Sequence, residues 1–123
     1  MIILEPAEAE VADVLDKAAD HIELVDWIQG SMYDQERADA GIPLTECPVC
    51  ADGAIHVAVH GKPVHAVDAT PREDGLVLHA ELAFLERVGS SISLFNDTAG
   101  RTMAVVVQEL RDTAKALRAG ATA

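Results

Sequence analysis

Both cysteines and two of the five histidines lie within one short segment of this 123-residue chain. Cys47 and Cys50 are followed by His56 and His60, residue types that bind zinc. On one continuous helix, however, Cys50 and His56 would lie roughly 9 Å apart along the axis and point about 120° apart. Two side chains placed in this way cannot both come within roughly 2.0–2.3 Å of one ion. We therefore expect no metal site and no cofactor.

Two alternative uses of the cysteines stay open. The thiols could bind a metal ion together with His21 or His65, which lie elsewhere in the chain. They could also act in thiol–disulfide exchange, because the start of a helix lowers a thiol pKa. The C-x-x-C spacing of Cys47 and Cys50 is diagnostic of such exchange only beside a βαβ pattern, and no predicted strand precedes Cys47. We favour a pair of small thiols, buried or half-buried, at the start of a helix.

The charge of the chain is strongly negative and unevenly distributed. The formal net charge is −12, and residues 1–53 carry 13 acidic side chains against 2 basic ones, whereas residues 54–123 carry 8 against 7. Such a field repels nucleic-acid phosphates and anionic lipid, so we expect no direct nucleic-acid binding and no membrane binding. It suits a protein partner with a basic surface. The candidate binding residues are the acidic side chains predicted to be exposed in this half: Asp13, Asp16, Asp20, Glu23, Asp34, Glu36 and Asp39.

The periodicity of the apolar residues predicts an all-α fold, a small helical bundle of about four main helices in a single domain, 1–123. The predicted main helices cover 7–29, 48–60, 71–88 and 102–118, with a short helical turn at 91–95 and frayed ends at about 1–6 and 119–123. Thr70, Pro71 and Glu73 form a capping-box pattern, and Gly30, Gly61 and Gly89 suit helix ends. Alternation leaves a short hairpin near 55–67 as an alternative.

Helical spacing also predicts which side chains face the core. In the predicted helix 71–88, Leu78, Leu82 and Leu85 widen the inward apolar face, and in the last helix Val105 is among the inward residues. Trp27 lies off the main apolar stripe of the first helix, where it either covers a neighbouring helix or serves as an exposed anchor. At the turn before the last helix, the side chains of Asn96, Asp97 and Arg101 are expected to satisfy backbone groups.

Three segments in this order resemble a known family. They are Trp27-x-Gln29-Gly30, Cys50-Ala51-x-Gly53-Ala54-Ile55 and Ser91-Ile92-x-x-Phe95-Asn96-Asp97-x-x-Gly100-Arg101-Thr102. The chain resembles, over about residues 9–118, a family of small uncharacterised domains of actinobacteria and their phages. The resemblance implies a compact helical domain with Cys50 at the start of a buried helix, and it implies no activity. Cys47 and the long connection 61–75 depart from the pattern.

These observations favour a small acidic accessory protein that binds another protein, and the resemblance allows a phage-encoded origin. No catalytic or nucleotide-binding motif occurs in the sequence, so we do not expect an enzyme. The absence of a signal sequence predicts a cytoplasmic location, in the host cell if the protein comes from a phage. Two alternatives stay open: a metal- or thiol-dependent regulatory module that uses Cys47 and Cys50, and an acidic nucleic-acid mimic that inhibits a DNA-binding protein.

Overall fold

The structure is a computed structural model that describes residues 5–122, with side chains for residues 5–120. The helices in chain order are α1 (Glu8–Val25), α2 (Gln35–Asp39), a 3-10 turn (Leu44–Glu46), α3 (Ala51–His60), α4 (Pro71–Val88), α5 (Ile92–Asp97) and α6 (Met103–Thr122). The predicted all-α class is therefore confirmed. The fraying expected at 1–6 and 119–123 falls partly outside the described residues, and within them α6 continues to Thr122.

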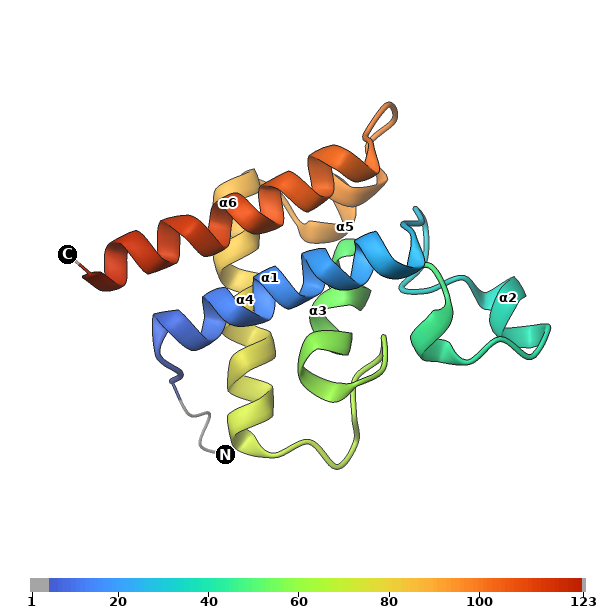
Figure 1. The fold of residues 1–123 in the computed structure, drawn as a ribbon, viewed down its shortest axis with the longest axis horizontal. Coiled ribbons are helices and arrows are strands. Elements are labelled where there is room, and N and C mark those ends of the chain that lie inside the picture. Colours follow the sequence, from blue (N-terminus) through green and yellow to red (C-terminus); the bar gives the residue numbers. More distant parts are fainter. Residues whose placement is uncertain (1–4, 123) are drawn as a thin grey trace.

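Two layers of helices enclose the core. Figure 1 shows α1 and α6 side by side and antiparallel, with α3 and α4 crossing behind them. The largest side chains with no exposed surface come from all four of these helices and include Leu15, Ile55, Phe84 and Leu110. Phe84 also meets Phe95 of α5 edge to face, with ring centroids 5.6 Å apart. One continuous core thus forms where the four main helices face one another.

The helix boundaries that were predicted from local caps are correct for α4. The Thr70 hydroxyl accepts a hydrogen bond from the backbone N–H of Glu73, and the Glu73 carboxylate accepts one from the backbone N–H of Thr70. Pro71 occupies the first helical position, and Gly89 ends the helix in the left-handed conformation, with φ of 76°. These residues satisfy backbone groups that a helix end leaves free, which is why the sequence located both ends.

Two other predicted boundaries are wrong by a few residues. The helix predicted over 7–29 ends at Val25, because Asp26 adopts φ of 88° and the chain then pairs with Val49 in an isolated bridge. The helix predicted over 48–60 begins at Ala51, with Cys50 as its cap. Since residues 51–60 are helical and no strand occurs among the described residues, the alternative hairpin near 55–67 does not form.

Four leucine and valine side chains predicted to face the core are instead exposed. Leu78, Leu82 and Leu85 on α4 expose 37%, 48% and 41% of their surface, and Val105 on α6 exposes 41%. The side of α4 that faces the core is occupied by Phe84 and by smaller residues. The leucines that widen the apolar face therefore point outward.

Candidate functional site

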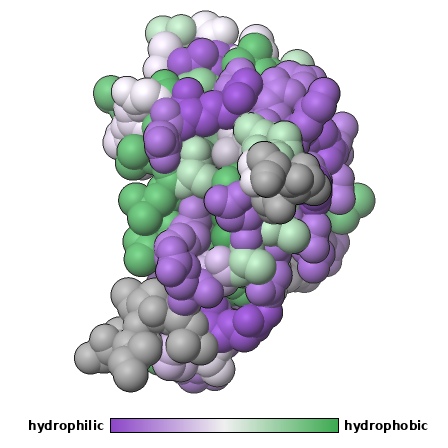
Figure 2. All heavy atoms as spheres, turned by 90° about the vertical axis from the view of Figure 1, so that its left-hand side faces the viewer, coloured by the Kyte–Doolittle hydropathy of each residue, from purple (hydrophilic) through white to green (hydrophobic). Residues whose placement is uncertain are grey.

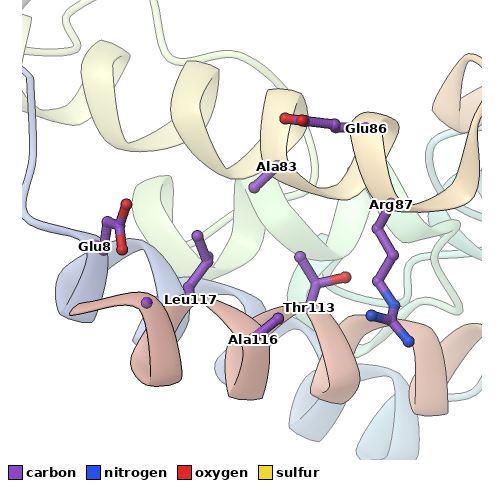
Figure 3. A pocket seen from close by; sticks show the side chains of 8 residues that line it. Glu8, Ala83, Glu86, Arg87, Thr113, Ala116 and Leu117 are labelled. Carbon is purple, nitrogen blue, oxygen red and sulfur yellow. The ribbon is translucent and has the colours of Figure 1, made fainter. Parts of the chain in front are cut away.

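A groove lies between α4 and α6. It has a volume of about 470 Å³ and is lined by Glu8, Ala83, Glu86, Arg87, Thr113, Ala116, Leu117 and Gly120. Figure 3 shows Ala83 of α4 facing Thr113 and Leu117 of α6 across it, with Glu8 near one end and Arg87 near the other. The floor is therefore built from small or apolar side chains on two rigid helices.

The groove continues past Leu82 toward the start of α1. A second hollow of about 200 Å³ shares Glu8, Ala83, Glu86 and Leu117 with the first and adds Leu82 and residues near the chain start. Figure 2 shows the end of the molecule where α1 begins and α6 ends, with hydrophobic side chains gathered along one edge and hydrophilic ones beside them. Because the two hollows share four residues, they form one extended groove with both apolar and charged side chains in its lining.

The rim of this groove is acidic. Arg87 is neutralised by α6, since its Nε lies 3.0 Å from Glu109 and its guanidinium lies 3.6 Å from Asp112. Within the described part of the chain, neither Glu8 nor Glu86 has an ion-pair partner. The groove therefore combines small and apolar side chains with two carboxylates, those of Glu8 and Glu86, that have no ion-pair partner among the described residues.

The carboxylates proposed from the sequence as binding residues lie in two places. Arg111 of α6 pairs with Asp20 at 2.8 Å, with Asp16 at 3.7 Å and with Glu23, while Arg118 pairs with Asp13 at 2.7 Å and with Asp16 at 2.5 Å. The four α1 carboxylates thus bind α6 within the chain. Asp34 caps α2 and pairs with Arg37, Asp39 accepts a hydrogen bond from Gln35, and Glu36 lies exposed on α2.

The three sequence motifs converge on a polar network around Asn96. Its Oδ1 accepts hydrogen bonds from Trp27 Nε1 at 2.7 Å and from the Ala51 backbone N–H at 2.9 Å, and its Nδ2 donates to the Ile28 carbonyl at 3.1 Å. Asn96 is 1% exposed. Two of these bonds go to the segment after α1 and one goes to the start of α3, so the network joins both of these segments to α5.

The neighbours of Asn96 extend this network with backbone contacts. Gln29 Nε2 donates to the carbonyls of Asn96 and Thr98, and Asp97 accepts from the Gly30 N–H. Arg101 donates to the Phe95 carbonyl at 2.9 Å. The expectation that Asn96, Asp97 and Arg101 satisfy backbone groups is confirmed, and Trp27 is a partly buried member of the network.

Both cysteines are buried free thiols with separate surroundings. Cys47 Sγ donates to the Pro43 carbonyl, and Cys50 Sγ accepts from the Gly53 N–H at the start of α3. Burial is the main cause that raises the pKa of each thiol, which favours the unreactive protonated form at neutral pH. Neither cysteine belongs to a group of metal-binding side chains among the described residues.

Two groups of histidine and carboxylate side chains could hold a metal ion. One comprises Asp52, His56 and Glu81, and the other comprises His60, His65 and Asp74; within each, ligand atoms lie within 4.8 Å of one another. In the first group, burial and then the neighbouring Asp52 raise the pKa of Glu81 to about 8. The sequence did not reveal either group, since each is completed by a carboxylate of α4, Glu81 in the first and Asp74 in the second.

The chain belongs to a family of unknown function, DUF6197, whose model matches residues 6–116. The matched range contains all three segments that meet at Asn96. Neither the curated proteins nor the solved structures include a match to this chain. Within residues 5–122, no helix combines the length and the apolar composition that crossing a membrane requires.

Proposed function

We propose that this domain acts by binding another protein, and that the groove between α4 and α6 receives an apolar helical segment flanked by basic residues. The observation that carries the proposal is the combination of an apolar floor at Ala83, Ala116 and Leu117 with uncompensated carboxylates at Glu8 and Glu86. Apolar surface provides most of the binding free energy, and the rim charges select the partner and its orientation.

The exposed leucines of α4 support the same assignment. Leu78, Leu82 and Leu85 follow the i, i+4, i+7 spacing of one helix face, and Leu82 also lines the groove. Clustered exposed leucines bordered by charge are typical of surfaces that bind proteins. A partner helix that lies in the groove would cover part of this face.

In this proposal, the negative charge of residues 1–53 attracts a basic partner over a long range. Along α1, the four carboxylates that pair with Arg111 and Arg118 still outnumber these two guanidiniums. Asp34, Glu36 and Asp39 add negative charge on and beside α2. We expect this field to speed association with a basic partner and to weaken as salt rises. The sequence resemblance supports an actinobacterial or phage origin.

The test compares three immobilised proteins in a lysate of the native host. Ala116→Arg fills the groove and places a basic group there. Leu94→Arg makes the same kind of change at an exposed site that does not line the groove. A partner retained by the wild type and by Leu94→Arg, but lost with Ala116→Arg, supports the assignment. Equal capture by all three proteins would rule out the groove. Circular dichroism verifies that both variants fold.

A further inference from the structure

Three side chains with the chemistry of metal ligands meet where α3 ends and α4 begins. His60 is the last residue of α3, His65 lies in the connection 61–69, and Asp74 lies in the first turn of α4. One ligand atom from each lies within 4.8 Å of the other two. Neither cysteine belongs to this group, and none of its residues lines the groove between α4 and α6.

The imidazole of His60 has no hydrogen-bond partner at either nitrogen. Both Nδ1 and Nε2 are buried, and neither finds a donor or acceptor within the described part of the chain. Its ring lies edge to face with that of His65, with centroids 5.7 Å apart, and no hydrogen bond joins the two rings. A buried polar atom left unsatisfied costs about 1–3 kcal/mol, so an unpartnered ring of this kind needs an explanation.

A bound cation supplies that explanation. Two imidazoles and one carboxylate form a set that suits divalent transition metals, whereas Mg²⁺ and Ca²⁺ prefer oxygen ligands alone. Ligands around Zn²⁺ at bond lengths of roughly 2.0–2.2 Å lie about 3.4 Å apart. Since the three ligand atoms lie within 4.8 Å of one another, they need to approach by at most about 1.4 Å. His65 is exposed and stands in a connection, which leaves its ring free to make that movement.

We propose that His60, His65 and Asp74 bind one divalent transition-metal ion, with Zn²⁺ as the probe. The exposed side of His65 leaves room for water or an outside ligand to complete the coordination. This site departs from the expectation, drawn from the cysteine spacing, that the chain binds no metal. It uses neither cysteine, and it needs only His60 from the four residues that first suggested zinc.

The neighbouring group of Asp52, His56 and Glu81 is less suited to the ion. His56 Nδ1 lies 2.9 Å from the Asp52 carbonyl oxygen and so already has a hydrogen-bond partner. Asp52 and Glu81 also lie close enough to share a hydrogen bond. This group serves as an internal control, because it lies on the same pair of helices and offers a similar set of side chains.

An ion at the proposed site would fix the connection 61–69 to both helices. That connection holds Val67, which is 97% exposed, and it has no helix of its own. A ligand that binds the folded chain and not the unfolded one raises the melting temperature with its concentration. Zn²⁺ should therefore stabilise the protein as well as bind to it.

The test is a calorimetric titration of the full chain with Zn²⁺ after treatment with a chelator, together with melting curves. We expect about one Zn²⁺ per chain, a higher melting temperature, and affinity reduced by about tenfold or more in His65→Ala and in Asp74→Asn. His65 is exposed, so its variant should fold, which circular dichroism verifies. Glu81→Gln should bind as the wild type does, and Mg²⁺ should give no heat.

Absence of Zn²⁺ binding to the wild type would overturn the proposal. Binding that survives both His65→Ala and Asp74→Asn would overturn it as well, as would binding that Glu81→Gln alone abolishes. Because the groove residues are unchanged in all of these variants, failure here leaves the proposed protein binding standing, and failure of the groove leaves the metal site standing.

Discussion

Trp27 donates its indole N–H to Asn96 Oδ1 over 2.7 Å, and this bond joins two residues that are 69 positions apart in the chain. The same oxygen accepts the N–H of Ala51 at the start of α3. One amide thus holds the segment after α1, the first turn of α3 and the end of α5 in a fixed arrangement. The three motifs of the sequence are, in this structure, parts of one hydrogen-bonded junction.

Removing the Asn96 amide should destabilise the protein strongly. Asn96→Ala leaves the Trp27 and Ala51 N–H groups and the Ile28 carbonyl without their partner, and we expect a loss of about 2–4 kcal/mol. Urea unfolding followed by the fluorescence of Trp27 measures it. Ser93→Ala on the same helix is the control, because Ser93 is exposed. A cost for Asn96→Ala no greater than for Ser93→Ala would mean that the network adds little stability.

Gly53 should not tolerate a methyl group. A Cβ at this position would lie 2.2 Å from the Met32 carbonyl oxygen, a contact that requires backbone movement. Glycine to alanine within a helix normally stabilises by about 0.5–1 kcal/mol, but here we expect a loss of about 1–3 kcal/mol. The melting temperature of Gly53→Ala, compared with that of the wild type, shows whether the substitution lowers or raises the stability.

Gly120→Ala on α6 is the matched control for that change. A Cβ there would approach only the flexible end of the Glu8 side chain, at 3.3 Å. That carboxylate can move, so the helix propensity of alanine should dominate and leave the stability equal or higher. If both variants melted at or above the wild-type temperature, the close approach of α3 to Met32 would be disproved.

Local signals in the sequence located some helix ends correctly, and they failed where contacts with distant residues determine the end of a helix or the burial of a side chain. The capping box at Thr70 and the glycine at position 89 depend on neighbours a few residues away, and they fixed α4. The end of α1 depends on pairing with Val49, which no local pattern reveals. Likewise, helical spacing identified Leu82 as apolar, but the face it occupies is set by how α4 packs.

The candidate sites show the same limit. In the sequence His60 follows Cys50 closely and suggested a shared metal site. In the structure Cys50 caps the start of α3 and His60 is its last residue, so the length of the helix separates them. The residues that lie near the His60 ring in the structure are His65 and Asp74, which the connection after α3 brings close to it. The acidic residues of α1 were predicted to form an exposed binding surface, because the sequence cannot show that Arg111 and Arg118 pair with them.

The ion pairs between α1 and α6 should make removal of the Arg111 charge on α6 destabilising. Arg111→Ala leaves Asp16, Asp20 and Glu23 to repel one another, and we expect a modest loss that shrinks as salt is raised. Urea midpoints at low and high ionic strength measure it. Lys115→Ala, on an exposed site of the same helix, is the control. A loss that does not change with salt would show that packing, rather than charge, is what Arg111 contributes.

Protonation of His21 should reduce stability in mild acid. Burial lowers the pKa of His21, and its Nε2 has no hydrogen-bond partner among the described residues. The unfolded chain therefore binds more protons at this site as the pH falls through the ordinary histidine pKa of about 6.5, and folding is disfavoured there. Relative to His21→Gln, the wild type should lose stability between pH 7.5 and 5.5. Urea midpoints that shift in parallel for the two proteins would contradict this.

The most direct test of the proposed function is to map the bound partner segment on the protein by NMR. Amide shifts of the 15N-labelled chain are followed while a synthetic peptide of the captured partner is added. We predict that the largest changes fall on Ala83, Ala116 and Leu117, which line the groove, and that rising salt weakens the binding. Changes centred on α2 or on the seam between α1 and α6, with the groove residues unmoved, would contradict the proposal.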